Sequence, residues 1–146
     1  MHEKLSSRVL VEALADAVIA TDAQGVIRWW NQASEKLFGH SAQVAMGQTL
    51  DLITPERLRQ RHWQGYHQAM AMGSSRYGDK LLRVPALHAS GASLSIAFTV
   101  SLLKNELGQV DLVVAVIRDE TQRFEEDKAL RAQLAQVQAQ QSIDRR

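Results

Sequence analysis

The chain has 146 residues, of which 45% are hydrophobic and 23% charged, with a formal net charge of +1 and no cysteine. This length favours a single domain with a proper core, the charge gives no argument for a nucleic-acid or membrane partner, and the missing cysteine excludes disulfides and thiolate metal sites. No apolar run approaches the roughly 20 residues that span a bilayer and no signal-peptide core is seen, so we expect a cytoplasmic protein.

Residues 3–14 are predicted to form an amphipathic helix. Leu5, Val9 and Ala13 share one stripe at helical spacing, and Leu10 and Leu14 widen it. Two roles stay open for this helix: it covers the domain's own sheet, or it packs on a partner subunit.

A strand, a turn, a strand and a short helix are predicted next. Val18–Thr21 and Val26–Trp30 are runs of β-branched and aromatic residues, and Asp22–Gly25 between them has the residues of a tight turn. Asn31 is suited to cap a helix that Gly39 ends.

Two adjacent tryptophans in the second strand are expected to point to opposite faces of the sheet. Of Trp29 and Trp30, one can line a pocket while the other lies on the outer face. An outer tryptophan needs cover from the leading helix or a second subunit, unless both side chains pack within the monomer.

Helical segments are predicted between the second and third strands. Ser41 and Thr49 are suited to cap short turns, and Thr54-Pro55-Glu56 has the pattern of a helix start. That helix is expected to run to about Met72, with Gly73 as its stop. One face of it carries Leu58, His62, Tyr66, Ala69 and Met70.

The second half of the chain is predicted to contain three strands. Residues 80–88 form the first, which Pro85 assigns to an edge or a bulge. Residues 93–102 alternate strictly between apolar and small or polar side chains, so one face is expected to be buried. The continuous apolar run 112–117 is expected to be a central strand covered on both faces.

From Glu120 onward the composition is typical of an exposed helix. Leu130, Leu134 and Val137 have heptad spacing, which predicts either a short coiled coil or a solvated terminal helix. We therefore divide the chain into a flanking helix at 1–14, a domain at 15–119 and a C-terminal helix at 120–146.

The first strand-turn-strand-helix unit closely resembles the start of PAS domains of the S-box type, the sensory modules of bacterial signalling proteins. The residues that carry the resemblance, which extends over about 12–124, are Asp22, Gly25, Trp30, Asn31, Ala33, Glu35, Leu37, Phe38 and Gly39. The resemblance implies an α+β fold in which a five-stranded antiparallel sheet cradles a pocket under helices on one face. The candidate pocket residues are then Trp30, Leu58, His62, Tyr66, Leu82 and Phe98.

No enzyme motif is found, so we expect a module without catalysis and assign no catalytic or metal-binding residues. The glycines never form a dinucleotide fingerprint, and no H-E-x-x-H zinc motif is present. Gly73–Gly78 has the spacing of a phosphate loop, but Asp79 stands where that loop needs lysine. Without cysteine, the flavin adduct of LOV photosensors and the chromophore link of photoactive yellow protein cannot form.

Arg61-His62 leaves a heme-binding gas or redox sensor as the alternative function. Heme-binding PAS sensors carry a histidine at a similar place as axial ligand. They use an arginine on the following strand, where Leu82 stands here in an ungapped register, with Arg83 on the opposite face. We favour a hydrogen-bonding role for His62 near the pocket mouth, and the cofactor stays unknown.

The segment around Asp119 and Thr121 resembles the Asp-x-Thr junction through which PAS domains pass signals to an effector, although a plain helix cap also explains it. We expect a homodimer that signals through a partner protein or effector domain, with a change in the pocket or dimer interface relayed to the C-terminal helix. The dimer candidates are Leu5, Val9, Ala13, Leu130, Leu134 and Val137.

Overall fold

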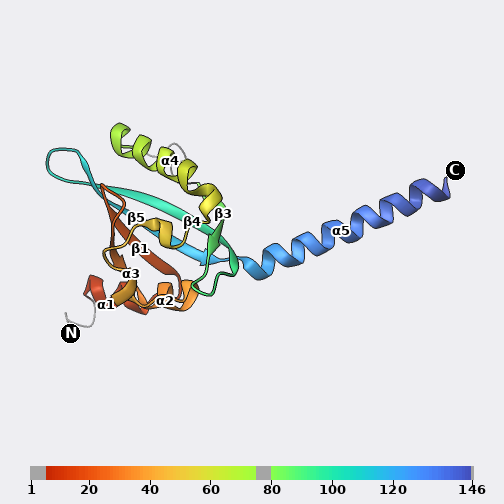
Figure 1. Ribbon diagram of the computed structural model, residues 1–146, viewed down its shortest axis with the longest axis horizontal. Coiled ribbons are helices and arrows are strands. Elements are labelled where there is room, and N and C mark those ends of the chain that lie inside the picture. Colours follow the sequence, from red (N-terminus) through yellow and green to blue (C-terminus); the bar gives the residue numbers. More distant parts are fainter. Residues whose placement is uncertain (1–5, 75–79, 146) are drawn as a thin grey trace.

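The computed structural model describes residues 6–74 and 80–145, so Leu5 of the expected leading stripe and most of the 73–78 loop lie outside the described residues. A five-stranded antiparallel sheet in the order β2-β1-β5-β4-β3 forms the centre of the molecule (Figure 1). The strands are β1 (Ala17–Asp22), β2 (Ile27–Trp30), β3 (Leu82–Leu87), β4 (Ser93–Lys104) and β5 (Val110–Asp119).

Helices and 3-10 turns connect β2 to β3 and flank the sheet at both ends of the chain. The long helix α5 extends away from the domain, as Figure 1 shows. The elements are α1 (Ser7–Ala13), α2 (Gln32–Phe38), α3 (Ala42–Ala45), η2 (Leu50–Leu52), η3 (Glu56–Leu58), α4 (Arg59–Met72) and α5 (Thr121–Asp144).

The strand order confirms two predictions about the second half of the chain. The apolar run 112–117 belongs to β5, which pairs with β1 on one side and β4 on the other and is the central strand. Pro85 lies in β3 at the edge of the sheet, where a residue without an N–H does not break an inner ladder.

The helices between β2 and β3 pack against one face of the sheet through two apolar clusters. In the first, Phe38 of α2 and Trp30 of β2 lie with ring centroids 5.5 Å apart, beside Ile19 and Ile117. In the second, Tyr66 of α4 packs on Val110 and Val113 of β5. Antiparallel pairing puts Ile19, Ile117 and Val113 on the same face, so both clusters lie between that face and the helices.

Asn31 is fully buried and joins three elements. Its Oδ1 accepts hydrogen bonds from Ser34 N at 3.0 Å, which confirms the predicted helix cap, and from Val18 N of β1 at 2.9 Å. Its Nδ2 donates to the carbonyl oxygens of Val11 at 2.9 Å and Asp16 at 3.1 Å. The cap therefore also attaches α1 and its linker to the sheet.

The predicted start of the long middle helix is wrong. Thr54 caps nothing, because its hydroxyl donates instead to the carbonyl of Leu50, the first residue of the preceding 3-10 turn, at 2.7 Å. A separate 3-10 turn, η3, follows Pro55, and the regular helix begins only at Arg59. The helix ends at Met72 before Gly73, as expected.

The outer face of the sheet is less covered than the apolar run 112–117 predicts. Val116 on that face is 39% exposed, so the expectation of cover on both faces of β5 is wrong. The two tryptophans do point to opposite faces: Trp30 is in the core, and Trp29 lies half-buried on the outer face with the Arg8 guanidinium 5.8 Å from its ring centroid.

Candidate functional site

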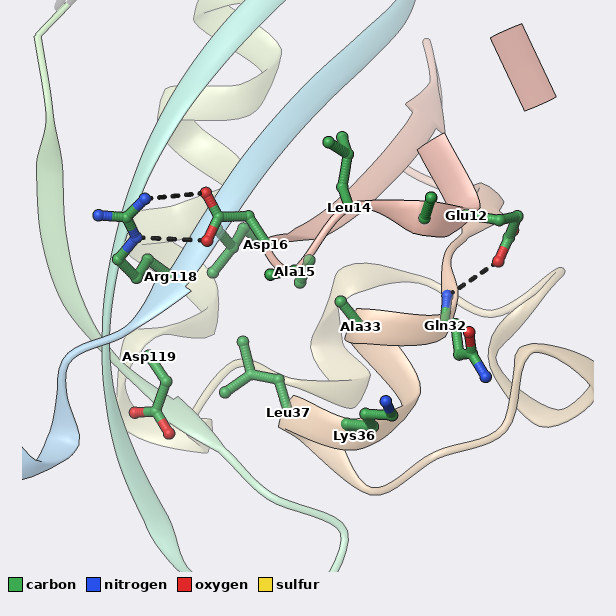
Figure 2. A pocket seen from close by; sticks show the side chains of 13 residues that line it. Glu12, Leu14, Ala15, Asp16, Gln32, Ala33, Lys36, Leu37, Arg118 and Asp119 are labelled. Carbon is green, nitrogen blue, oxygen red and sulfur yellow. Dashed lines mark hydrogen bonds and ion pairs between the residues drawn. The ribbon is translucent and has the colours of Figure 1, made fainter. Parts of the chain in front are cut away.

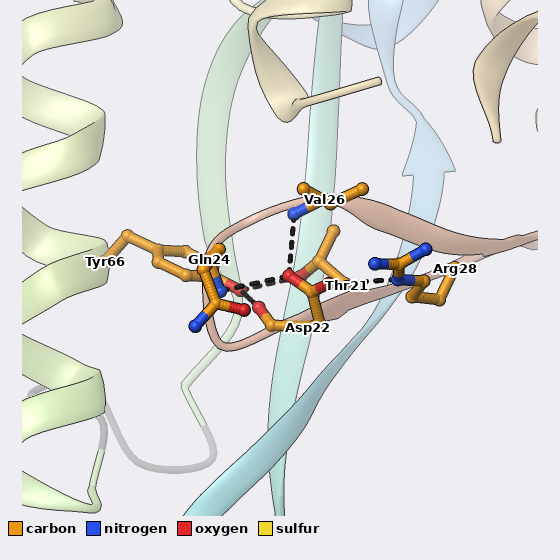
Figure 3. Close-up of polar contacts among 6 residues, drawn as sticks. All are labelled: Thr21, Asp22, Gln24, Val26, Arg28 and Tyr66. Carbon is orange, nitrogen blue, oxygen red and sulfur yellow. Dashed lines mark hydrogen bonds and ion pairs between the residues drawn. The ribbon is translucent and has the colours of Figure 1, made fainter. Parts of the chain in front are cut away.

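Tyr66 fastens α4 to the hairpin formed by β1 and β2 (Figure 3). Its hydroxyl donates a short hydrogen bond to the carbonyl of Asp22 and lies 2.9 Å from the hydroxyl of Thr21, which therefore donates to it. Burial raises the pKa of the Tyr66 phenol above its usual range, so the group remains a donor at neutral pH. The middle of α4 is thus held by a buried polar contact.

Asp22 organises the turn beneath Tyr66. Its Oδ1 accepts hydrogen bonds from the backbone N–H groups of Gln24 and Val26, each at 3.0 Å, and its Oδ2 accepts from Arg28 Nε at 2.9 Å. Desolvation opposes ionisation, but the bonds from Val26, Arg28 and Gln24 together outweigh it and lower the pKa of the Asp22 carboxyl. The ionised Asp22 carboxylate therefore stabilises the turn.

Trp63 connects α4 both to η2 and to the same turn. Its Nε1 donates to Asp51 Oδ1 at 2.8 Å, and its ring covers Gly25, where a Cβ would come within 2.3 Å of the ring. Gly25 has φ +81°, a left-handed conformation that favours glycine, so both backbone shape and the tryptophan require this residue type.

His62 lies beside Trp63 and Tyr66, with ring centroids at 4.8 and 6.0 Å. Its Nδ1 is buried and has no hydrogen-bond partner among the described residues. Burial lowers the pKa of the imidazole, opposed by the nearby Asp51 carboxylate, so the ring is neutral at pH 7. The hydrogen-bonding role expected for His62 therefore has no partner in this part of the chain.

A heme would find a neutral histidine here, but the surroundings do not fit it. Tyr66 and Trp63 fill the space beside the imidazole and are tied down by their own hydrogen bonds. Leu82 pairs with Phe98 on the inner face, whereas Arg83 points to the outer face, as the ungapped register predicts. These residues do not form an open heme site.

The structure divides the six candidate pocket residues rather than gathering them. His62 and Tyr66 are neighbours on α4, and Leu82 lies opposite Phe98 in the β3–β4 ladder. Phe98 packs against the first cluster, which contains Trp30, while Tyr66 belongs to the second. Leu58 is half-buried at the end of η3. All face the helix-covered side of the sheet or the helices upon it.

The junction between β5 and α5 is clamped to β4. Asp119 Oδ1 accepts hydrogen bonds from Thr121 N at 2.9 Å and Thr121 Oγ1 at 2.6 Å. Thr121 Oγ1 in turn accepts from Ser95 N at 2.9 Å, and Glu120 N donates to Ser95 O at 2.8 Å. Both predicted relay residues therefore take part in one network with β4.

Sequence reasoning missed a second connection at this junction. Arg83 of the edge strand β3 donates from Nε to Glu120 Oε2 at 3.1 Å, and Arg123 Nη1 lies 3.6 Å from Glu120 Oε1. Both arginines thus contact Glu120, the residue between Asp119 and Thr121. Only the pairing of β3 with β4 brings Arg83 here, and no short motif signals it.

Two clefts lie at this end of the molecule, and no pattern in the sequence predicts either. A cleft of about 680 Å³ is bounded by the end of α1, the α1–β1 linker, α2 and the end of β5 (Figure 2). Across it, Arg118 Nε and Nη2 each bind one carboxylate oxygen of Asp16 at 3.2 Å. A second cleft, of about 370 Å³, runs along the start of α5 and shares Arg118 and Asp119 with the first.

The expected dimer residues in the described part of the chain are all exposed. Val9 and Ala13 lie on α1, and Leu130, Leu134 and Val137 lie on α5, which buries no residue. Within residues 6–74 and 80–145, no helix combines the length and the apolar character needed to cross a membrane.

Five antiparallel strands in the order β2-β1-β5-β4-β3, with the connecting helices on one face, define the PAS fold. A family model described as "PAS fold" matches residues 7–120. The chain belongs to the PAS family.

Two relatives in sequence cover different shares of the chain. A protein of uncharacterised function from Azorhizobium caulinodans is 32% identical over 124 residues, which are 84% of this chain and 17% of that protein. The sensor protein FixL of Bradyrhizobium diazoefficiens is 38% identical over 55 residues, which are 38% of this chain and 11% of that protein. The chain therefore spans less than a fifth of either relative.

Solved structures share the fold. A PAS domain from Colwellia psychrerythraea superposes with a TM-score of 0.68 at 25% identity, covering 77% of this chain and 92% of that one. An RNA-binding light-oxygen-voltage receptor gives a TM-score of 0.70 at 20% identity, covering 90% of this chain and 39% of that one. A PAS domain of an HTR-like protein from Haloarcula marismortui gives 0.63 at 21% identity, covering 81% and 93%.

Proposed function

We propose that this chain is a non-catalytic sensory module of bacterial signal transduction. Changes at the helix-covered face of the sheet, or at a dimer interface, are relayed to α5 and from there to an effector domain or partner protein. The family supports a sensory role, because PAS domains are generally sensory modules, and one relative is named a sensor protein. As part of the same proposal, the sensory domain spans residues 15–119 between two flanking helices, and the protein is cytoplasmic.

The clamp between β4 and the start of α5 is the observation that carries the proposal. Ser95 bonds through both its N–H and its C=O to the junction, and Arg83 adds an ion pair from β3. The inner faces of these same strands bear the half-buried Phe98 and Leu82. A ligand or packing change that shifts β3 and β4 therefore alters the direction of α5, since among the described residues the helix has no other attachment to the domain of comparable extent.

A kinase fusion tests the relay. A histidine kinase unit is joined to α5 in helical register, and its autophosphorylation is measured for Tyr66→Phe, Thr121→Val and the double variant. Tyr66→Phe perturbs the packing of α4, and Thr121→Val breaks the bond to Ser95. We expect each single variant to change output several-fold, and the effect of Tyr66→Phe to disappear in the Thr121→Val background.

Thr99→Val is the matched control, because Thr99 lies on β4 opposite Val116 and forms no bond with α5. It should leave kinase output unchanged. Additive effects of Tyr66→Phe and Thr121→Val would contradict a relay through the junction.

An absorbance spectrum distinguishes the heme-sensor alternative from the proposed function. We expect the purified protein, supplied with hemin, to give no sharp Soret band that disappears in His62→Ala, because Trp63 and Tyr66 occupy the space beside the imidazole. A stoichiometric Soret band that depends on His62 would instead support the heme-sensor alternative.

A further inference from the structure

The two clefts at the end of β5 join into one surface. The larger lies between α1, α2 and β5, the smaller follows the first turns of α5, and both are lined by Arg118 and Asp119. We call the combined surface the junction groove. The lining residues that matter for binding are Glu12, Leu14, Leu37, Arg118, Asp119 and Glu126.

The wider end of the junction groove has an apolar lining. Ala33 and Leu37 of α2 and Leu14 of the α1–β1 linker lie around it (Figure 2). Ile117 of β5 also lines it. Leu14 is 48% exposed, so a large apolar side chain there lacks cover in the monomer. Such a site can take one apolar side chain of a partner as an anchor.

The charges left unpaired along the junction groove are mainly negative. Arg118 is paired with Asp16, and Glu120 is paired with Arg83 and Arg123, so these groups are already satisfied. Among the described residues, Glu12, Asp119 and Glu126 have no ion-pair partner, and the same holds for the single cation Lys36. The acidity is local, because the whole chain has a net charge of +1.

We propose that the junction groove docks a basic amphipathic segment of a partner protein. An apolar side chain of that segment enters between Leu14 and Leu37, and its cationic side chains meet Glu12, Asp119 and Glu126. The occupant is an extended segment because the groove continues from α2 across β5 to the second turn of α5, a path that a compact ligand would fill only at one end.

The location gives this surface a role beyond the relay itself. The docked segment touches the domain at α2 and the exit helix at Gln122 and Glu126, so its affinity depends on the angle between the two. By linkage, a partner that prefers one angle also favours that angle in the sensor.

Fluorescence anisotropy with a labelled amphipathic peptide of leucine and lysine tests the proposal. We expect saturable binding that Leu14→Lys weakens by about tenfold and Glu126→Lys by about threefold, with loss of affinity as salt rises. A peptide with glutamate in place of lysine should bind far more weakly. Both substitutions are at exposed positions, so the variants should keep the circular dichroism of the wild type.

Two matched variants make the same changes outside the junction groove. Leu107→Lys alters an 83% exposed leucine in the β4–β5 turn, and Glu125→Lys alters the neighbouring exposed carboxylate on α5. Neither should change peptide binding. Equal losses in all four variants, equal binding of the acidic peptide, or no binding of the basic peptide would overturn the proposal. If Leu14→Lys abolished self-association of the protein, the groove would instead bind a second copy of the chain, and the proposal would be wrong.

Discussion

The hydroxyls of Tyr66 and Thr21 form a buried pair at the level of single residues. Tyr66→Phe keeps the ring but removes its hydroxyl. The Thr21 hydroxyl, in a residue that is 2% exposed, then loses its acceptor, and the Asp22 carbonyl loses a donor. We expect the free energy of unfolding to fall by about 1–2 kcal/mol in urea denaturation.

A double-variant cycle shows whether the hydrogen bond between these two hydroxyls causes the loss of unfolding free energy. Thr21→Val should also destabilise, but Thr21→Val combined with Tyr66→Phe should cost less than the sum, because both polar partners are then removed together. Simple additivity of the two losses would mean that the hydroxyl pair contributes no coupling.

Asp22 gives the stability of the protein a defined pH dependence. Its folded pKa lies below the unfolded value of 3.8, so the unfolded state binds the proton more readily. The stabilisation is therefore complete above that value and is lost as the pH falls through the folded pKa. We expect Asp22→Asn to flatten the decrease in unfolding free energy on acidification below about pH 5.

Asp111→Asn is the control for this measurement, because Asp111 is exposed on β5 and makes no ion pair with the described residues. Its pH profile should follow the wild type. If Asp22→Asn also follows the wild type, the turn is not stabilised by the carboxylate.

At the level of secondary-structure elements, α4 is fastened to the β1–β2 hairpin in addition to packing on β5. Trp63 packs on Gly25 and Tyr66 bonds to the strand before it. Gly25→Ala introduces both a strained φ of +81° and a Cβ only 2.3 Å from the Trp63 ring. We expect a loss of about 2–4 kcal/mol, with a shift in tryptophan fluorescence as the ring moves.

Gly108→Ala separates the two causes. Gly108 has a similar φ of +77° in the β4–β5 turn, but a Cβ there would meet no atom within 4 Å. It should cost only about 1 kcal/mol, the backbone strain alone. Equal losses for the two alanine variants would show that Trp63 moves aside freely and does not hold α4 on the turn.

Elements determined by neighbouring residues were the ones that sequence reasoning could predict. The Asn31 cap, the stop at Gly73 and the edge position of Pro85 each depend on a few positions along the chain, and the structure confirms them. Thr54 fits the same kind of pattern, yet its hydroxyl has a competing carbonyl at Leu50 that no cap rule includes.

Contacts set by strand register could not be predicted in this way. Arg83 meets Glu120 because β3, β4 and β5 align at that end of the sheet, and Arg118 meets Asp16 across 102 positions of sequence. The candidate site was therefore found only in part: the relay pair at Asp119 and Thr121 was proposed in advance, whereas its ion pairs and the junction groove were not.

Across the whole molecule, apolar surface remains where a second copy could cover it. Val9 and Leu10 of α1 are exposed, Val116 opens the outer face of β5, and the heptad leucines of α5 are exposed, Leu130 to 63%. A helix of 24 residues, about 36 Å long, that buries none of its residues gains little of the tertiary packing that supplies most helical stability in proteins. We therefore expect the protein to be a dimer with paired α5 helices.

Leu130→Glu combined with Leu134→Glu should shift the protein toward monomer in light scattering, because the apolar seam is removed and like charges face each other. The β signal in circular dichroism should remain, since neither residue contacts the sheet core. Ala132→Glu with Gln136→Glu adds the same two charges, also four residues apart, on the opposite side of α5 and should leave the dimer intact. A wild type that stays monomeric at high concentration would mean that α5 is a solvated tail, and that the relay needs an effector to hold this helix.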